Sequence, residues 1–353
     1  MYMMQNVLAA LGMVLAGIPM MLFAMSLGFK AVPTAIGFLI GIGGMLAFSS
    51  VIPISIQAGT IGLIGALGKN AKERISMALF AGLAMVIIGG FGLVHNIIDL
   101  AGPRVVLGMQ AGVGIILAKV AINMVKDNKF VGLVSLVVAL ILWFLTRDLV
   151  YATGASVIAS CIAFYIKNKG PMDVAEEKYK WEIHKPIYNV NVLRGTLALI
   201  CLMIGSNIAF GGIVAGMAGV QPNIDHLTIY SGLANLSALF GGAPVEVIAS
   251  ATGAAPQPMA SGIILMGIMA AILIVGLLPK IARFVPSASV AGTLFVIGAF
   301  MTTPGNAFNA FNGAERAEFL GAGVALLLTA IIDPFFGLVA GTIIRILQPV
   351  FGL

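Results

Sequence analysis

The stretch GGAPVEVIAS, residues 241–250, places one carboxylate, Glu246, between apolar segments and beside a glycine pair and a proline. The chain has only 13 acidic residues among 353. A charged side chain at membrane depth is costly, so an isolated one there is a candidate functional residue. The alternative is a structural role, in which Glu246 caps the helix that follows it. We expect Glu246 to bind the ligand and to be able to carry a proton.

A second stretch, FSSVIPISIQAGTIGLIGALG at residues 48–68, has the same design around Pro53. Like Pro244 in the first stretch, Pro53 lacks a backbone N–H and favours an extended residue before it. Each stretch therefore predicts a short extended piece and then a half-helix too short to cross a bilayer. Such irregular chain occurs at membrane depth only where protein buries it or where it lines a cavity. Paired broken elements point to a transporter's binding site, with two half-helix N-termini facing each other.

Polar side chains on these two stretches are candidate ligand contacts. Ser55, Gln57 and Thr60 belong to the first stretch, and Ser250 and Thr252 belong to the second. Each alone is more often a hydroxyl or amide that packs helices together. The sequence contains no nucleotide-binding loop, zinc-ligand spacing or Ser/His/Asp set, and its three histidines are widely separated. It therefore predicts a protein that is no enzyme and that has no cofactor or bound metal.

The composition predicts that the elements holding these residues are membrane helices. The chain is 60% hydrophobic and 9% charged, whereas soluble domains are about one quarter charged. Its 44 glycines are expected where helices pack closely in lipid. The net charge of +6 resides in short loops, so it indicates no nucleic-acid partner. We expect an all-α, multi-pass protein of the cell membrane (inner or plasma membrane), with a small-molecule solute as its ligand.

Apolar runs divide the chain into fourteen segments, seven on each side of a polar stretch. Residues 1–166 form the first repeat, residues 167–190 a polar interfacial linker, and residues 191–353 the second repeat. A straight span needs about 20 residues, and several segments are shorter than that. The segments are 6–28, 34–50, 56–68, 75–95, 105–124, 130–146, 149–166, 191–216, 228–240, 247–257, 259–278, 287–303, 316–332 and 334–352.

Three pairs of similar sequences recur in the same order in the two halves, at offsets of 185, 191 and 184 residues. An odd number of spans per repeat turns the second copy upside down. The pattern therefore predicts two inverted seven-segment repeats, the architecture of secondary transporters. The pairs begin at Asn6 and Asn191, at Ile52 and Ala243, and at Gly92 and Gly276.

The chain resembles the nucleobase–cation symporter-2 family, the xanthine and uracil permeases. LFGGAP, residues 239–244, is similar to the Gly-Gly-Thr-Pro sequence that begins that family's tenth segment. LFVIGAF, residues 294–300, is similar to family sequence after segment eleven. The resemblance implies fourteen segments, with a strand and a half-helix in segments 3 and 10. It also implies a core of segments 1–4 and 8–11, a gate of segments 5–7 and 12–14, and a homodimer.

Several binding residues of that family are replaced in this chain. Ser250 stands where the family has a Glu about six residues after the proline, and the acid here is Glu246. The eighth segment, LMIGSNIAFGG, has no acid and offers Ser206 and Asn207. The first segment lacks the family's Gln-His pair and carries Phe23 there. The resemblance therefore supports the fold better than the substrate.

The leading interpretation is a secondary transporter of a small planar solute, a purine or pyrimidine base, coupled to protons. Glu246 and half-helix N–H groups would bind the base, with amide contacts from Gln57 and Asn207. An anion permease for sulfate, molybdate or bicarbonate is the alternative, because the resemblance extends to such permeases and two helix N-termini suit an oxyanion. Glu246 argues mildly against it. A third possibility is a membrane scaffold that transports nothing, supported by the missing acid in segment eight.

The distribution of basic residues conflicts with the resemblance about orientation. Most Lys and Arg residues fall in loops after odd-numbered segments, and the other loops and the tail hold only Arg104, Arg147, Arg316 and Arg345. The positive-inside rule then places both termini outside the cytoplasm. The resemblance implies that both lie inside. The sequence leaves the orientation open.

Overall fold

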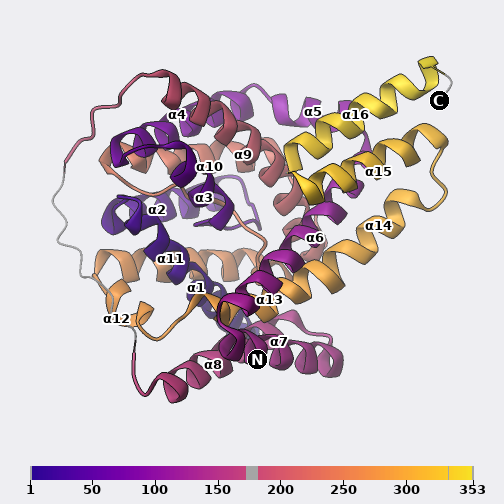
Figure 1. Ribbon diagram of the computed structural model, residues 1–353. Helices are drawn as coiled ribbons and strands as arrows, with labels where there is room; N and C mark the ends of the chain where they lie inside the picture. The colour runs from indigo at the N-terminus through magenta and orange to yellow at the C-terminus, as the bar shows by residue number, and fades with distance from the viewer. Residues whose placement is uncertain (1, 172–181, 333, 352–353) are drawn as a thin grey trace.

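The computed structural model describes residues 2–171, 182–332 and 334–351, and this part of the chain is mostly helical (Figure 1). The first half contains α1 (Tyr2–Ser26), α2 (Ala31–Ala47), β1 (Ile54–Ser55), α3 (Ala58–Leu67), α4 (Ala71–Gly90), α5 (Leu93–Ala101), α6 (Pro103–Asp127), α7 (Lys129–Thr146) and α8 (Leu149–Asn168). The second half contains α9 (Val190–Met217), α10 (Ile224–Ala234), η1 (Asn235–Phe240), β2 (Glu246–Val247), η2 (Ala251–Ala254), α11 (Pro258–Ile274), α12 (Leu278–Ala282), η3 (Ser287–Val290), α13 (Ala291–Phe295), η4 (Val296–Thr302), α14 (Thr303–Phe311), α15 (Arg316–Ile331) and α16 (Pro334–Phe351).

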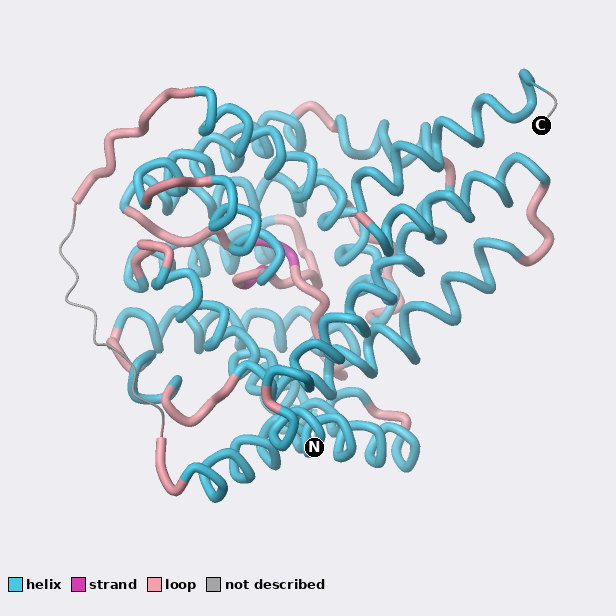
Figure 2. The backbone as a smooth tube through the Cα atoms, in the orientation of Figure 1, coloured by secondary structure: helices cyan, strands magenta, loops and turns pink. Residues whose placement is uncertain are grey.

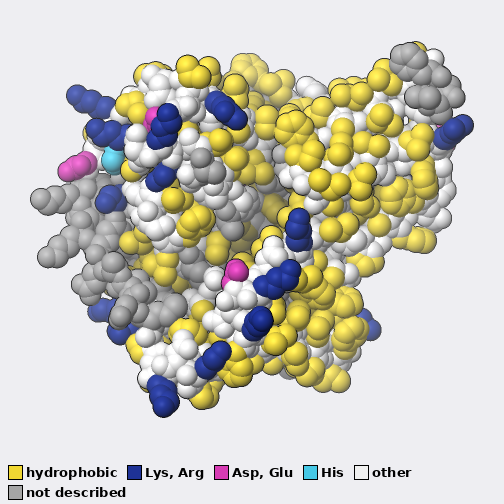
Figure 3. Space-filling view, in the orientation of Figure 1, with side chains coloured by type: hydrophobic (Ala, Val, Ile, Leu, Met, Phe, Trp, Pro, Cys, Tyr) yellow, Lys and Arg dark blue, Asp and Glu magenta, His cyan; other side chains and the backbone are white. Residues whose placement is uncertain are grey.

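Helix length and composition confirm a multi-pass membrane protein. Among the described residues, seven helices are long and apolar enough to span a bilayer. They are α1, α4, α6, α7, α8, α9 and the helical run 287–311. Hydrophobic side chains cover much of the outer surface over α14, α15 and α16, whereas Lys and Arg lie mainly in the left part of the view and in a row from its centre to its lower left (Figure 3). That division matches an apolar belt in lipid and charged ends in water.

The helices form two groups that lie on opposite sides of the molecule. The first group contains α1 to α4 and α9 to α11, and within it α2 packs on α10 and α11, and α4 packs on α9 and α10. In the second group, α6 packs along α14, α15 and α16, which extend together as an arm (Figure 1). Small residues permit the close packing: a Cβ on Gly112 would lie 2.5 Å from the Leu326 carbonyl oxygen, and one on Gly341 would lie 2.6 Å from that of Gly321.

Two strands at the centre of the first group pair with each other, although they come from opposite halves of the chain (Figure 2). β1 and β2 are antiparallel, with Ile54 opposite Val247 and Ser55 opposite Glu246. This arrangement confirms the extended pieces predicted from Pro53 and Pro244. It leaves the first turn of α3 directly after β1, deep in the protein.

Side chains form hydrogen bonds with the backbone groups around Pro53 and Pro244. The Tyr230 hydroxyl donates to the carbonyl of Ile52, just before Pro53. On the other strand, the Val245 N–H donates to the Asn235 side chain at 2.7 Å, and the Ala243 N–H donates to the Thr34 hydroxyl at 2.8 Å. Buried backbone groups that the strands cannot pair therefore find partners on α2, α10 and η1.

The half-helix predicted after β2 is wrong. Only η2, a four-residue 3-10 turn, follows this strand, whereas the ten-residue α3 follows β1. Pro256 and Pro258 explain the difference, because proline cannot donate to a helix and pushes the residue before it into extended backbone. Ala255, just before Pro256, has φ −71° and ψ 155°.

The structure also contains two short helices that the segment list missed, α5 and α12. Each follows a glycine with left-handed backbone, Gly92 at φ 67° and Gly276 at φ 69°. These are the two glycines that begin the third pair of similar sequences. In the run that follows α12, the helix passes through a π-helical stretch, Val296–Thr302.

Residues 182–189 of the polar linker lie over one end of the first helix group. The His184 N–H donates to the Leu239 carbonyl at 2.8 Å, and the Ile187 N–H donates to the Ser76 hydroxyl at 3.0 Å. Partial burial of the imidazole lowers the pKa of His184. The rest of the predicted linker includes residues 172–181, which lie outside the described residues.

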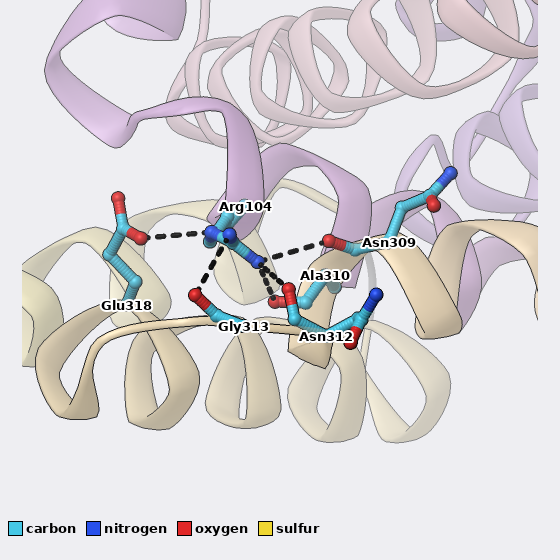
Figure 4. Close-up of polar contacts among 6 residues, drawn as sticks. All are labelled: Arg104, Asn309, Ala310, Asn312, Gly313 and Glu318. Atoms are coloured by element: carbon cyan, nitrogen blue, oxygen red, sulfur yellow. Dashed lines mark hydrogen bonds and ion pairs between the residues drawn. The ribbon is translucent and has the colours of Figure 1, made fainter.

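Arg104, at the start of α6, joins three helices of the second group (Figure 4). Its guanidinium donates to the carbonyls of Asn309, Asn312 and Gly313 at 2.9 to 3.2 Å, near the C-terminus of α14. It also forms an ion pair with Glu318 of α15 at 2.9 Å. A cation there compensates the free carbonyls and negative dipole of a helix C-terminus.

We expect Arg104→Gln to lower the free energy of unfolding by about 1–3 kcal/mol, since hydrogen bonds to charged groups contribute on that order. Thermal melting of the purified protein in detergent measures the effect. Arg316→Gln is the matched control, because Arg316 is exposed nearby and no polar contact of its side chain is found in the described part of the chain. Equal melting temperatures for the two variants would contradict the role of Arg104.

Candidate functional site

A cavity of about 330 Å³ lies between the two helix groups. The first group contributes α1, β1, α3, α9 and the residues after β2, and the opposite wall comes from α6, η3, α13 and the region between α15 and α16. The lining residues are Met13, Ala16, Gly17, Met20, Ser55, Ile56, Gln57, Gly59, Val113, Ile116, Leu117, Val120, Met124, Leu202, Ser206, Phe210, Ile248, Ala249, Val290, Leu294, Ile332 and Pro334.

Among the described residues, those that line this cavity with polar side chains are Ser55, Gln57 and Ser206. Ser55 and Ser206 are each 1% exposed, and neither hydroxyl has a hydrogen-bond partner among the described residues. Two unpartnered hydroxyls in a cavity wall are free to bond a ligand. No Lys, Arg, His, Asp or Glu is among the described residues of the lining.

Gln57 precedes the first turn of α3, and the nitrogen and the oxygen of its side-chain amide each form a hydrogen bond that holds it in place. Its Nε2 donates to the Val247 carbonyl of β2 at 3.2 Å, and its Oε1 accepts from the Thr60 hydroxyl at 3.0 Å. Its side chain does not cap α3. The first N–H groups of α3, including that of Gly59 in the cavity wall, therefore have no partner within the helix.

Gly59 leaves space in front of this helix end. A Cβ there would meet only the Gln57 Oε1, at 3.4 Å. A ligand can thus approach the backbone N–H groups where the positive end of the helix dipole lies.

Glu246 is not among the residues that line the cavity. Its side chain is completely buried, and neither carboxylate oxygen has a hydrogen-bond partner among the described residues. It sits opposite Ser55, which lines the cavity, in the antiparallel strand pair. An unpartnered carboxylate in such a place is costly to hold in its charged form.

The remaining predicted site residues lie outside the cavity lining. Asn207 is completely buried and donates to the Thr228 hydroxyl of α10 at 3.1 Å. Ser250 accepts from the Thr252 N–H at 3.3 Å and so caps η2. Thr60 is engaged with Gln57, and Phe23 of α1 is 42% exposed. The cavity thus brings together Ser55 and Gln57 of the predicted set.

The sequence analysis missed two features of the site, the backbone of Gly59 and the apolar walls. Ser206 was noted beside Asn207 but not chosen, although it is the one of the two that lines the cavity. Periodicity offered a signal, because neighbouring helical residues point about 100° apart. No group of three His, Cys, Asp or Glu residues positioned for a metal ion occurs in the described ranges.

The fold is that of a multi-pass membrane protein with a cavity between its two helix groups. No protein-family profile and no curated sequence matches the chain. The structure is similar to the transmembrane domain of the cyanobacterial bicarbonate transporter BicA, with a TM-score of 0.63 and 17% identity over 96% of this chain and 97% of that one. It is also similar to the murine anion transporter Slc26a9 in its inward-facing state, with a TM-score of 0.64 and 14% identity over 99% of this chain and 69% of that one. Another SLC26A9 structure gives a TM-score of 0.63 and 14% identity over 99% of this chain and 66% of that one.

These similarities correct the resemblance to the nucleobase–cation symporter-2 family, which was wrong. The solved structures that share this fold are a bicarbonate transporter and an anion transporter, and no family profile supports the nucleobase permeases. In the structure, the motif LFGGAP ends η1, turns the chain at Gly241 with φ 88° and leads into β2. At these identities the comparisons establish the fold.

Asn207 and Ser206 provide a direct test of the site geometry. We expect Asn207→Ala to lower the melting temperature, because it removes the buried hydrogen bond that the Asn207 amide donates to the Thr228 hydroxyl, which contributes about 0.5–1.5 kcal/mol. Ser206→Ala removes a hydroxyl that bonds no protein group, so its melting temperature should stay within about 1 °C of wild type. Thermal melting in detergent compares the two. The reverse order of stabilities would contradict the assigned positions.

Proposed function

We propose that this protein is a secondary transporter that carries a small anion across the membrane. The observation that carries the proposal is the open N-terminus of α3 in a cavity between two helix groups. Backbone N–H groups and a positive dipole end attract an anion, and none of the described residues of the lining carries a carboxylate that would repel it. Similarity in fold to a bicarbonate transporter and an anion transporter supports the same class.

The proposed architecture is fourteen membrane segments in two inverted repeats, residues 1–166 and 191–353. Segments 1–4 and 8–11 form the core, and segments 5–7 and 12–14 form the gate. The strand pair β1–β2 and the two glycines Gly92 and Gly276 at matching sequence positions support this division. Alternating access then consists of rocking the core against the gate, with the cavity at their boundary.

We also propose a homodimer, a transport cycle without enzymatic catalysis, and coupling to protons. Glu246 supports the coupling, because a buried carboxylate without a partner favours a bound proton, whereas opening of the cavity to water would favour its release. Its position opposite Ser55 makes its charge sensitive to an anion in the cavity.

Proteoliposomes containing the purified protein test the transport function. We expect uptake of at least one anion from a set of chloride, bicarbonate, sulfate, acetate and benzoate, above that of empty liposomes. Gly59→Leu should reduce that uptake about tenfold or more, equivalent to about 1.4 kcal/mol, because the new side chain occupies the space before the α3 N-terminus.

The matched control for this variant is Gly62→Leu. Gly62 is on the same helix, has no atom within 4 Å of its added Cβ and does not line the cavity. It should transport like wild type. Absence of any anion uptake, or full activity of Gly59→Leu, would contradict the proposal.

Glu246→Gln tests the coupling. The amide keeps the size of the side chain but carries no exchangeable charge, so we expect uptake driven by an inward proton gradient to fall to the rate without a gradient. Anion exchange at equal pH on both sides should continue. Glu315→Gln, at an exposed acid outside the cavity, is the control. Gradient-driven uptake that persists in Glu246→Gln would exclude this carboxylate as the proton carrier.

A further inference from the structure

We infer that the cavity selects an organic anion with a single carboxylate and a compact apolar body, in preference to a small inorganic anion. This inference rests on the proposed anion-transport function and names the substrate class of the same cavity. Benzoate and other carboxylates of similar size belong to the class.

The walls of the cavity are predominantly apolar. Of the 22 described residues that line it, Ser55, Gln57 and Ser206 have polar side chains, and the rest are aliphatic residues, methionines, one phenylalanine, glycines and a proline. A strongly hydrated inorganic oxyanion would lose water around its whole surface and regain few hydrogen bonds in such a site. An apolar body, in contrast, gains from the same walls, since its transfer from water is favourable.

The polar side chains and free N–H groups of the cavity lie on the wall that the first helix group forms. Ser55 lies on β1, Gly59 lies two residues into α3, and Ser206 lies on α9, which contacts both α3 and β2. The opposite wall, formed by α6 and α13, contributes Val113, Ile116, Leu117, Val120, Met124 and Leu294. A ligand with one polar end and one apolar end therefore matches the two sides of the cavity.

The electrostatics favour one negative charge. α3 offers a single helix N-terminus, equivalent to about half an elementary charge, together with two unpartnered hydroxyls. η2 adds no second such end, because it has four residues and Ser250 already caps it. The described lining contains no cationic side chain, so nothing in it would compensate the second charge of a dianion.

The volume sets the size of the ligand. A cavity of about 330 Å³ holds on the order of ten non-hydrogen atoms, since a water-sized group occupies about 30 Å³. A carboxylate uses three of them and leaves room for an apolar body the size of one aromatic ring. Acetate and bicarbonate would leave most of the apolar wall without contacts.

Binding to the purified protein in lipid nanodiscs tests the inference through the rise in melting temperature with ligand concentration. The ligands are benzoate, its uncharged isostere benzamide, the dianion terephthalate, acetate, bicarbonate and sulfate. We expect benzoate to bind at least tenfold more tightly than each of the others. Benzoate should also be taken up by proteoliposomes, and Gly59→Leu should abolish both binding and uptake.

A pair of neighbouring residues on α6 supplies a matched test of the apolar wall. Ile116 lines the cavity, and Ile115 is 38% exposed on the outer surface. Ile116→Ser should weaken benzoate binding at least fivefold without weakening acetate, whereas Ile115→Ser should leave both unchanged. Equal loss of benzoate binding in the two variants would overturn the inference.

The other outcomes separate this inference from the proposed function. Bicarbonate or sulfate that binds as tightly as benzoate, and loses binding in Gly59→Leu, would overturn the selectivity for an organic anion and support anion transport. Benzamide that binds as tightly as benzoate would overturn both proposals, because the site would then not recognise charge. Uptake of inorganic anions without any binding of benzoate would overturn the inference alone.

Discussion

The backbone hydrogen bonds between β1 and β2 are the constraint on which the rest of the structure depends. Extended chain in the middle of a membrane protein must find partners within the protein, because lipid offers none. Here Ser55 and Glu246 belong to two strands that form hydrogen bonds with each other. The backbone groups that flank the two strands form hydrogen bonds with the side chains of Tyr230, Asn235 and Thr34. This network fixes the place where α3 begins.

The cavity follows from that fixed starting point. A continuous helix would have satisfied the N–H groups around Gly59 with the preceding turn, and the strand leaves them free. Gln57 bonds across to Val247 and holds the helix end against the second strand. The second helix group closes the space with apolar side chains from α6 and α13. The ligand site thus consists of the free N-terminus of α3 on one side and the apolar wall of the second helix group on the other.

The sequence predicted the parts of this arrangement that local chemistry controls. Prolines at positions 53 and 244 determined the extended pieces, and the apolar runs determined the membrane helices. The absence of a half-helix after β2 was not predictable from the repeat alone, because Pro256 and Pro258 break in the second half a pattern that continues in the first. Glu246 attracts attention because acidic residues are rare in this chain. The direction of its side chain could not be predicted, because it depends on how a two-residue strand pairs with a strand from the other half of the chain. The choice of Asn207 over Ser206 depended on helix rotation, which an apolar sequence with weak periodicity does not specify.

The pairing of strands from the two halves has a consequence for biosynthesis. Gln57 and Val247, which bond across the strand pair, are 190 residues apart in the chain. At about 5–20 residues per second, the ribosome needs roughly 10–40 s to deliver the second strand after the first has emerged. During that interval the first half has several helices ready to insert but carries a strand without its partner. The insertion machinery or water must therefore cover the chain around Pro53 until translation of the second half supplies β2.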